Sequence, residues 1–89
     1  MSLREFKAKY MAKLMTLCKQ LFEKYNDRSD RVQYVCDLIA MKLRSLRTFT
    51  LTDYLATLYN ACKEFRELEA LIPSEKEVEE LIKTPDLDQ

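Results

Sequence analysis

The 89-residue chain contains no glycine, no histidine and no tryptophan, and only two prolines. Without glycine it cannot form the glycine-rich loops that cradle phosphate groups. Without histidine it lacks the Ser-His and Cys-His pairs of nucleophilic catalysis, most zinc sites and the usual proton shuttle at neutral pH. These absences predict a protein that is not an enzyme, with no catalytic residue, no metal ion, no cofactor and no small-molecule substrate.

The bulk composition favours a small folded domain. Apolar residues make up 47% of the chain and charged residues 34%, which is unlike a disordered sequence. No apolar run approaches the roughly 18 residues that a membrane-spanning helix needs, so we expect no membrane association. Because a chain of this length usually has one hydrophobic core, we expect a single domain over residues 1–89.

The three cysteines, Cys18, Cys36 and Cys62, form an odd set. Disulfide frameworks of small secreted proteins use an even number of cysteines. The charged residues 1–9 also lack the apolar core of a signal peptide. The sequence therefore predicts three thiols that serve as small buried apolar side chains, in a protein of the reducing cytoplasm.

Helix signals fill most of the chain. In a capping box, a hydroxyl accepts a hydrogen bond from a helical amide, and a carboxylate three residues on accepts one in return. Three pairs have this spacing: Ser2 with Glu5, Thr50 with Asp53, and Ser74 with Glu77. Apolar residues recur at helical spacing, and no segment alternates with a period of two. The patterns predict helices over about residues 3–25, 30–47, 51–71 and 75–83, with a frayed tail at 84–89.

The connections between these helices predict how they pack. The polar segment 26–30 is the clearest loop, Phe49 is expected to pack on Tyr54 at the next turn, and Pro73 ends the third helix. Sequential helices with short connections are antiparallel neighbours. The apolar stripe of the first helix covers about half its circumference, which predicts two neighbours. We therefore predict an all-α fold, an antiparallel three-helix bundle with a short fourth C-terminal helix.

Charge is balanced overall but uneven along the chain. Lys/Arg and Asp/Glu number six and two in residues 1–25, six and four in 26–63, and three and nine in 64–89. The three segments therefore carry net charges of +4, +2 and −6. Two interpretations are open: the segments attract one another within the bundle, or one of them forms a charged binding face.

A second apolar cluster marks the predicted helix 30–47. Tyr34, Leu38 and Met41 lie nearly opposite its main apolar stripe. Either the fourth helix covers this cluster or a partner binds there, since tyrosine and methionine are enriched at interfaces. Tyr59 either extends the patch or caps the core. We favour a non-enzymatic protein-interaction module, such as an adaptor, assembly factor or small inhibitor, that binds another protein or a second copy through this helix face.

The alternative hypothesis is a small nucleic-acid-associated or transcription-modulating regulator. Phosphate contacts require clustered cations. The candidate polyanion contacts come from the predicted helices 3–25 and 30–47 and the residues beside them: Lys9, Lys13, Arg28, Arg31, Lys42, Arg44 and Arg47. The net charge of zero favours the interaction hypothesis, because dedicated nucleic-acid binders are usually basic.

Overall fold

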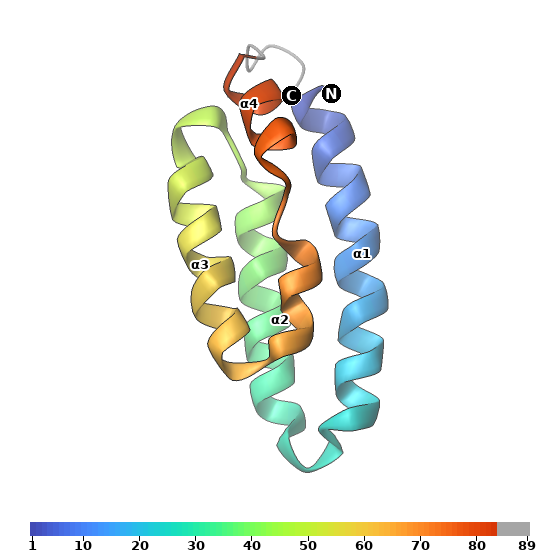
Figure 1. Cartoon of the computed structure of the whole chain (residues 1–89). Helices are drawn as coiled ribbons and strands as arrows, with labels where there is room; N and C mark the ends of the chain where they lie inside the picture. Colours follow the sequence, from blue (N-terminus) through green and yellow to red (C-terminus); the bar gives the residue numbers. More distant parts are fainter. Residues whose placement is uncertain (84–89) are drawn as a thin grey trace.

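The computed structural model describes residues 1–83, and its regular elements are all helical (Figure 1). Its α-helices are α1 (Leu3–Lys24), α2 (Ser29–Arg44), α3 (Leu51–Glu64) and α4 (Glu75–Lys83). Short 3₁₀ helices lie between them: η1 (Asn26–Arg28), η2 (Thr48–Thr50) and η3 (Arg66–Leu71). The predicted all-α helical bundle is confirmed, whereas the predicted tail at 84–89 lies outside the described residues.

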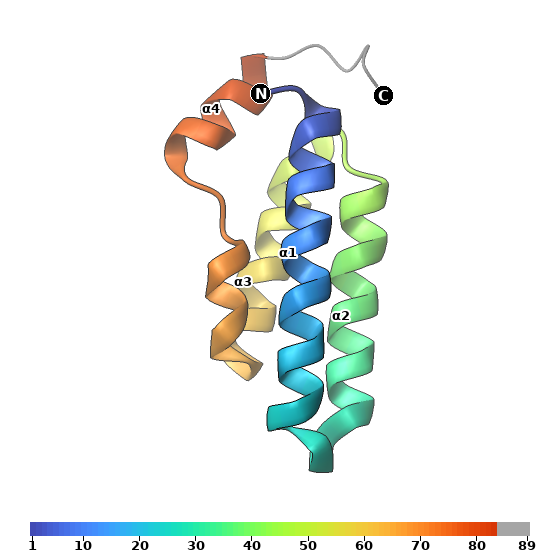
Figure 2. The same ribbon diagram turned by 90° about the vertical axis from the view of Figure 1, so that its right-hand side faces the viewer.

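The helices α1 and α2 form an antiparallel hairpin closed by η1 (Figure 1). Helix α3 runs back along α2, and η3 lies between α3 and α1 (Figures 1 and 2). Helix α1 therefore packs against both α2 and η3. This arrangement gives the wide apolar stripe of α1 the two neighbours that its width predicts.

The range 51–71, predicted as one helix, is two elements, so that prediction is wrong. Phe65 has extended backbone angles (φ −130°, ψ 98°) between α3 and η3, and the chain reverses there (Figure 1). The reversal buries Phe65 fully and brings η3, with its buried Leu68 and Leu71, against α1. A continuous helix would leave α1 without its second neighbour. Burial of that apolar surface therefore outweighs the local preference for an unbroken helix.

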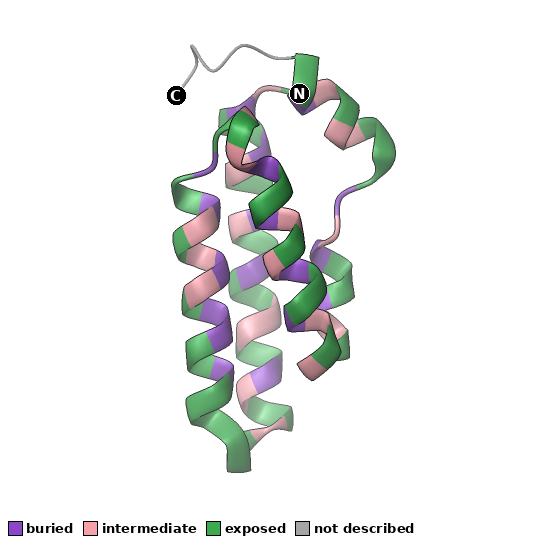
Figure 3. Ribbon diagram, turned by 90° about the vertical axis from the view of Figure 1, so that its left-hand side faces the viewer, coloured by how far each residue is buried: buried purple, intermediate pink, exposed green. Residues whose placement is uncertain are grey.

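Buried residues, coloured purple in Figure 3, lie mostly on the sides of the helices that face one another. The largest fully buried side chains are Tyr10, Tyr54, Phe6, Phe65, Leu21, Ile39, Leu43, Leu46, Leu58, Leu68, Leu71 and Val32. Aromatic contacts join the elements at both ends of this core. Phe6 meets Tyr54 edge to face at 6.5 Å between ring centroids, and Tyr25 meets Phe65 at 5.0 Å. These contacts connect α1 to α3 and to the turn that follows it.

Helix α4 lies across one end of the bundle, beside α1 and α3 (Figure 2). Its capping box is confirmed, because the Glu77 amide donates to Ser74 Oγ (3.2 Å) and the Ser74 amide donates to Glu77 Oε1 (3.1 Å). Glu77 also accepts a hydrogen bond from the Tyr10 hydroxyl and forms an ion pair with Lys9, both at 2.7 Å. Leu81 is buried. The same carboxylate therefore begins α4 and fastens it to α1.

The other two predicted capping boxes have different outcomes. Ser2 and Glu5 form the box at the start of α1, with both hydrogen bonds at 3.1 Å. Thr50 does not cap α3: its hydroxyl accepts from the Arg47 amide (2.9 Å) inside η2. The 3₁₀ turn runs directly into α3, so Thr50 lacks the extended backbone of an N-cap. The expected contact of Phe49 with Tyr54 is also wrong, because Phe49 is 82% exposed.

Two of the three cysteines are paired, which corrects the prediction of three free thiols. Cys18 of α1 and Cys36 of α2 form a disulfide, with their Cα atoms 6.3 Å apart. The antiparallel hairpin brings these positions face to face, and the cysteine count alone cannot reveal that. Cys62 is free and half-buried. Burial, together with the nearby Glu69 carboxylate, raises the pKa of the Cys62 thiol.

The longest helix, α1, is amphipathic rather than uniformly apolar. Across residues 1–83, no helix combines the length and the hydropathy that crossing a bilayer requires.

Candidate interaction surfaces

Tyr34, Leu38 and Met41 line the outer side of α2, and we call these three residues the α2 face. Tyr34 is 57% exposed and Met41 is 53% exposed, while Leu38 is half-buried. A shallow hollow of about 230 Å³ runs beside Tyr34 and Leu38, between α2 and α3. Its lining contains no residue of α4. The fourth helix therefore does not cover this cluster, which was one of the two alternatives left open by the sequence.

Ion pairs between α2 and α3 flank both ends of the α2 face. At one end, Arg31 donates two hydrogen bonds to Glu64 (2.8 and 2.7 Å), and its guanidinium lies 5.1 Å from the Tyr34 ring centroid. The hydrogen bonds from Arg31 lower the pKa of the Glu64 carboxyl. At the other end, Lys42 pairs with Asp53 at 2.7 Å. The charged groups at both ends are thus already matched within the chain.

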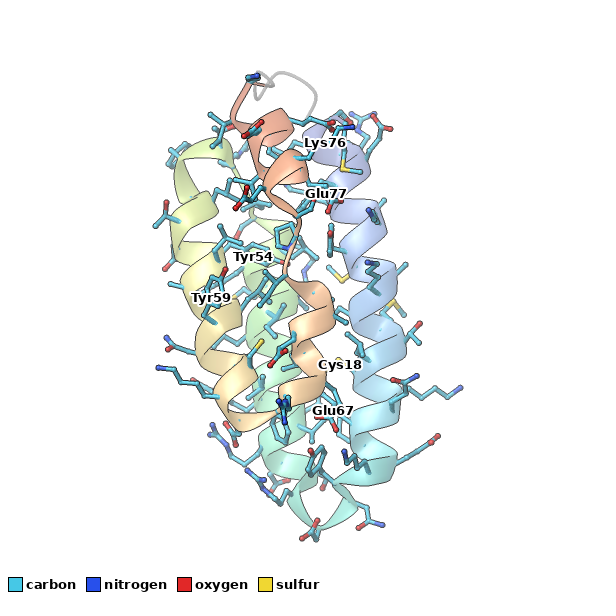
Figure 4. All side chains as sticks on the ribbon, in the orientation of Figure 1. Cys18, Tyr54, Tyr59, Glu67, Lys76 and Glu77 are labelled. Carbon is cyan, nitrogen blue, oxygen red and sulfur yellow. A yellow bond between two sulfur atoms is a disulfide. The ribbon has the colours of Figure 1, made fainter. Side chains whose placement is uncertain are left out.

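Tyr59 does not extend the α2 face. It is 54% exposed and lines a separate hollow of about 280 Å³ between α3, Pro73 and α4. Figure 4 shows both tyrosines on α3, with Tyr54 nearer the middle of the bundle than Tyr59. Tyr59 also remains too exposed to act as a core cap. Of the four predicted partner-binding residues, the fold thus brings three together and separates the fourth.

The seven predicted polyanion contacts are spread over several faces. Four of them form ion pairs with carboxylates of this chain: Lys9 with Glu77, Arg28 and Arg31 with Glu64, and Lys42 with Asp53. Lys13 lies over the Tyr10 ring, 5.0 Å from its centroid. Arg47 precedes η2. Lys13 also lines a hollow of about 390 Å³, and Arg44 lines the larger groove that is described next.

A groove between α1 and α2, which the sequence analysis did not single out, has a volume of about 750 Å³. We call it the α1–α2 groove. Its lining is mostly apolar and consists of Met11, Leu14, Met15, Cys18, Lys19 and Phe22 of α1 and Gln33, Cys36, Asp37, Ala40 and Arg44 of α2. In the sequence, Met11, Met15 and Phe22 only widen the apolar stripe of α1, and packing against two neighbouring elements also explains that width. Core packing would bury all of these side chains, yet Met15 is 69% exposed.

The polar groups of the described residues do not converge on a metal site. Within residues 1–83, no three His, Cys, Asp or Glu side chains lie close enough together to hold a metal ion. One buried polar atom lacks a hydrogen-bond partner in this part of the chain, the Tyr54 hydroxyl. Burial raises the pKa of Tyr54 to about 12, so the group stays neutral. The chemistry that these surfaces offer is binding through apolar contacts and charged rims.

The fold and these surfaces define the class of the protein as an all-α helical bundle with exposed apolar faces. Comparison of the chain with protein-family models, with curated proteins and with solved structures finds no match.

Proposed function

We propose that this chain is a non-enzymatic protein-interaction module that self-associates through the α2 face. The observation that carries the proposal is the exposure of Tyr34 (57%) and Met41 (53%), on a helix whose main apolar stripe is buried in the core. Exposed aromatic and methionine side chains at helical spacing are typical of helix-mediated interfaces. Such a module acts by binding, as an adaptor, assembly factor or small inhibitor does.

The charges around the α2 face favour a second copy as the partner. Because Arg31 pairs with Glu64 and Lys42 with Asp53, neither end of the face presents an unmatched charge of one sign. Identical surfaces can therefore approach without like-charge repulsion. In a two-fold arrangement with antiparallel α2 helices, Leu38 lies near the axis. Tyr34 of one copy then packs on Met41 of the other.

Sedimentation velocity of the purified chain over a concentration series tests this proposal. We expect a dimer for the wild type and a monomer for the double variant Leu38→Lys and Met41→Lys, with helical circular dichroism unchanged. Ile82→Lys is the matched control, since Ile82 is 59% exposed on α4, away from the α2 face. A wild type that stays monomeric contradicts the proposal. If the double variant unfolds, Tyr34→Glu provides the same test at a more exposed position.

The alternative function is association with nucleic acid. It draws support from residues 1–47, where eleven Lys/Arg and five Asp/Glu give a net charge of +6. Four of the seven candidate cations form ion pairs within the chain, and this weakens the case for nucleic-acid binding because those charges are already matched. Retention on a heparin column over a salt series tests it, because phosphate contacts give a steep salt dependence. Elution at low salt contradicts this function.

The cytoplasmic location expected from the sequence stays a prediction, and the disulfide provides its test. A reducing cytoplasm keeps cysteines as thiols, whereas an oxidising compartment preserves disulfides. Alkylation during denaturing lysis of the native cells, followed by mass spectrometry, counts the thiols. Modification of Cys18, Cys36 and Cys62 supports the cytoplasm, and modification of Cys62 alone contradicts it.

A further inference from the structure

The α1–α2 groove is larger than the hollow beside the α2 face, at about 750 Å³ against 230 Å³, and the proposed self-association does not use it. We propose that this groove binds an amphipathic helix of a partner protein, whose apolar stripe is flanked by carboxylates. The inference adds a second surface to the proposed interaction module. It does not depend on self-association, because the two surfaces lie on different sides of α2.

The shape and lining of the groove fit a helix. The elements η3 and α3 cover one side of the α1–α2 hairpin, and the groove lies on the hairpin's other side. Residues 11–22 of α1 span three turns, about 18 Å, along its wall. Methionines at Met11 and Met15 adapt to different apolar side chains. The small Ala40 on the opposite wall allows a close approach of backbones. A bound helix would complete a helical layer on this side.

The charges around the groove indicate the chemistry of that helix. Residues 1–47 carry a net charge of +6 and residues 48–89 a net charge of −6. Some of these cations form ion pairs with the C-terminal half, as Lys9 does with Glu77 and Lys24 with Glu67. The groove lies on the other side of the hairpin, with Lys19 on one wall and Arg44 on the other. Its single carboxylate, Asp37, accepts a hydrogen bond from Gln33 at 2.8 Å.

The lining of the α1–α2 groove favours a helix with acidic flanks over two other possible occupants, a second copy of this chain and nucleic acid. A second copy that used this groove would bring Lys19 and Arg44 of both copies together against only one Asp37 from each, and this excess of positive charge opposes such a dimer. Nucleic acid would meet a wall of Met11, Met15 and Phe22, which offers no hydrogen bonds to phosphate or base. A helix with an apolar stripe and acidic flanks can bury its stripe against the apolar lining and place its carboxylates near Lys19 and Arg44.

Two synthetic peptides of about 18 residues provide the probe, since that length forms about five helical turns. Both have the same leucine and alanine stripe; one has glutamate and the other lysine at the flanking positions. Fluorescence anisotropy of end-labelled peptide measures binding to the full chain at low salt. We expect the glutamate peptide to bind about tenfold or more tightly than the lysine peptide, as two favourable rim contacts would give.

Two matched substitutions locate the binding. Met15→Gln should abolish or strongly weaken binding of the glutamate peptide, while Met41→Gln on the α2 face should leave it unchanged. Both residues are exposed on helices, at 69% and 53%, so neither change should unfold the chain. The double variant Lys19→Glu and Arg44→Glu should reverse the preference to the lysine peptide.

Several outcomes would overturn the inference. These are equal binding of both peptides, binding of neither, or binding that Met15→Gln leaves intact. Loss of the sedimentation dimer in Met15→Gln would identify the groove as the interface between copies instead. Failure of the α2-face proposal is distinguishable, because it appears as a wild-type monomer in sedimentation and leaves peptide binding unaffected.

Discussion

The Glu77 side chain caps the start of α4 and also binds two residues of α1, Lys9 and Tyr10. Partial burial of its carboxyl disfavours the charged form, but hydrogen bonds from Lys9, Tyr10 and the Ser74 amide outweigh that cost. Together they lower the pKa of Glu77 from 4.5 to about 2. In return, burial and the hydrogen bond to Glu77 raise the pKa of Tyr10 well above its usual value. Figure 4 shows Glu77 on α4, pointing toward α1.

The substitution Glu77→Gln tests this link, because glutamine can still serve in a capping box but has no charge. We expect it to lower the free energy of unfolding at pH 7 by about 2 kcal/mol. Since the folded-state pKa is depressed, the ionised carboxyl stabilises the fold above pH 4.5. That stabilisation is lost as the pH falls from 4.5 to about 2. Urea unfolding at several pH values should show a larger loss in the wild type than in the variant, which keeps only the contributions of other carboxyls with a lowered pKa, such as Glu64.

Glu79→Gln is the control for this measurement, because Glu79 is an exposed residue of the same helix. It should behave like the wild type over the whole pH range. An acid-induced loss of stability that is as large in Glu77→Gln as in the wild type would contradict the prediction.

At the scale of elements, both a disulfide and buried apolar side chains join α1 to α2. The Cys18–Cys36 disulfide joins the two helices beside the α1–α2 groove. The core contributes separately, because Leu14 and Leu21 of α1 and Val32 and Ile39 of α2 are buried. The hairpin therefore has both a covalent and an apolar connection.

Removal of the disulfide with Cys18→Ser and Cys36→Ser should lower the free energy of unfolding by about 3 kcal/mol. The physical reason is that the bond closes a loop between residues 18 positions apart and so restricts the unfolded chain. Urea unfolding with and without reductant measures the effect, and the reduced wild type should match the double variant. Cys62→Ser should change little, and an unfolding midpoint that reductant leaves unmoved would contradict the prediction.

At the scale of the whole molecule, the uneven charge along the sequence becomes contact between oppositely charged parts. Ion pairs connect α1 and η1 to the acidic residues that follow position 63: Lys9 with Glu77, Lys24 with Glu67, and Arg28 with Glu64. This supports the interpretation that the segments attract one another within the bundle. The cations of the α1–α2 groove, Lys19 and Arg44, lie outside these pairs, and a charged binding face there stays a prediction.

Raising sodium chloride from about 0.05 to about 0.5 M shortens the screening length and should lower the free energy of unfolding by about 1 kcal/mol. The effect is small because the paired side chains keep part of their exposure, as with Lys24 at 64% and Glu67 at 25%. Urea unfolding at both salt concentrations measures it. The double variant Glu64→Gln and Glu67→Gln should depend less on salt, and a wild type that salt stabilises would contradict the argument.

Local patterns in the sequence predicted most of the helices. The capping boxes at Ser2 and Ser74 and the polar loop after Tyr25 depend on neighbouring residues, so they were readable without a fold. The break at Phe65 was not, because residues 51–71 keep one apolar stripe and contain no proline or glycine to mark it. The α2 face was visible as surplus apolar surface. The α1–α2 groove was not, since its methionines continued a stripe that core packing already explained.

Local sequence patterns are enough to predict the all-helical class, the antiparallel order of α1 and α2 and the chemistry that a chain without histidine or glycine lacks. Composition and spacing of near neighbours decide these properties. The tertiary structure alone decided three others: the reversal at Phe65, the pairing of Cys18 with Cys36, and which apolar faces stay open. Each depends on residues far apart in the chain competing to bury the same surface, and that competition has no signature in local spacing.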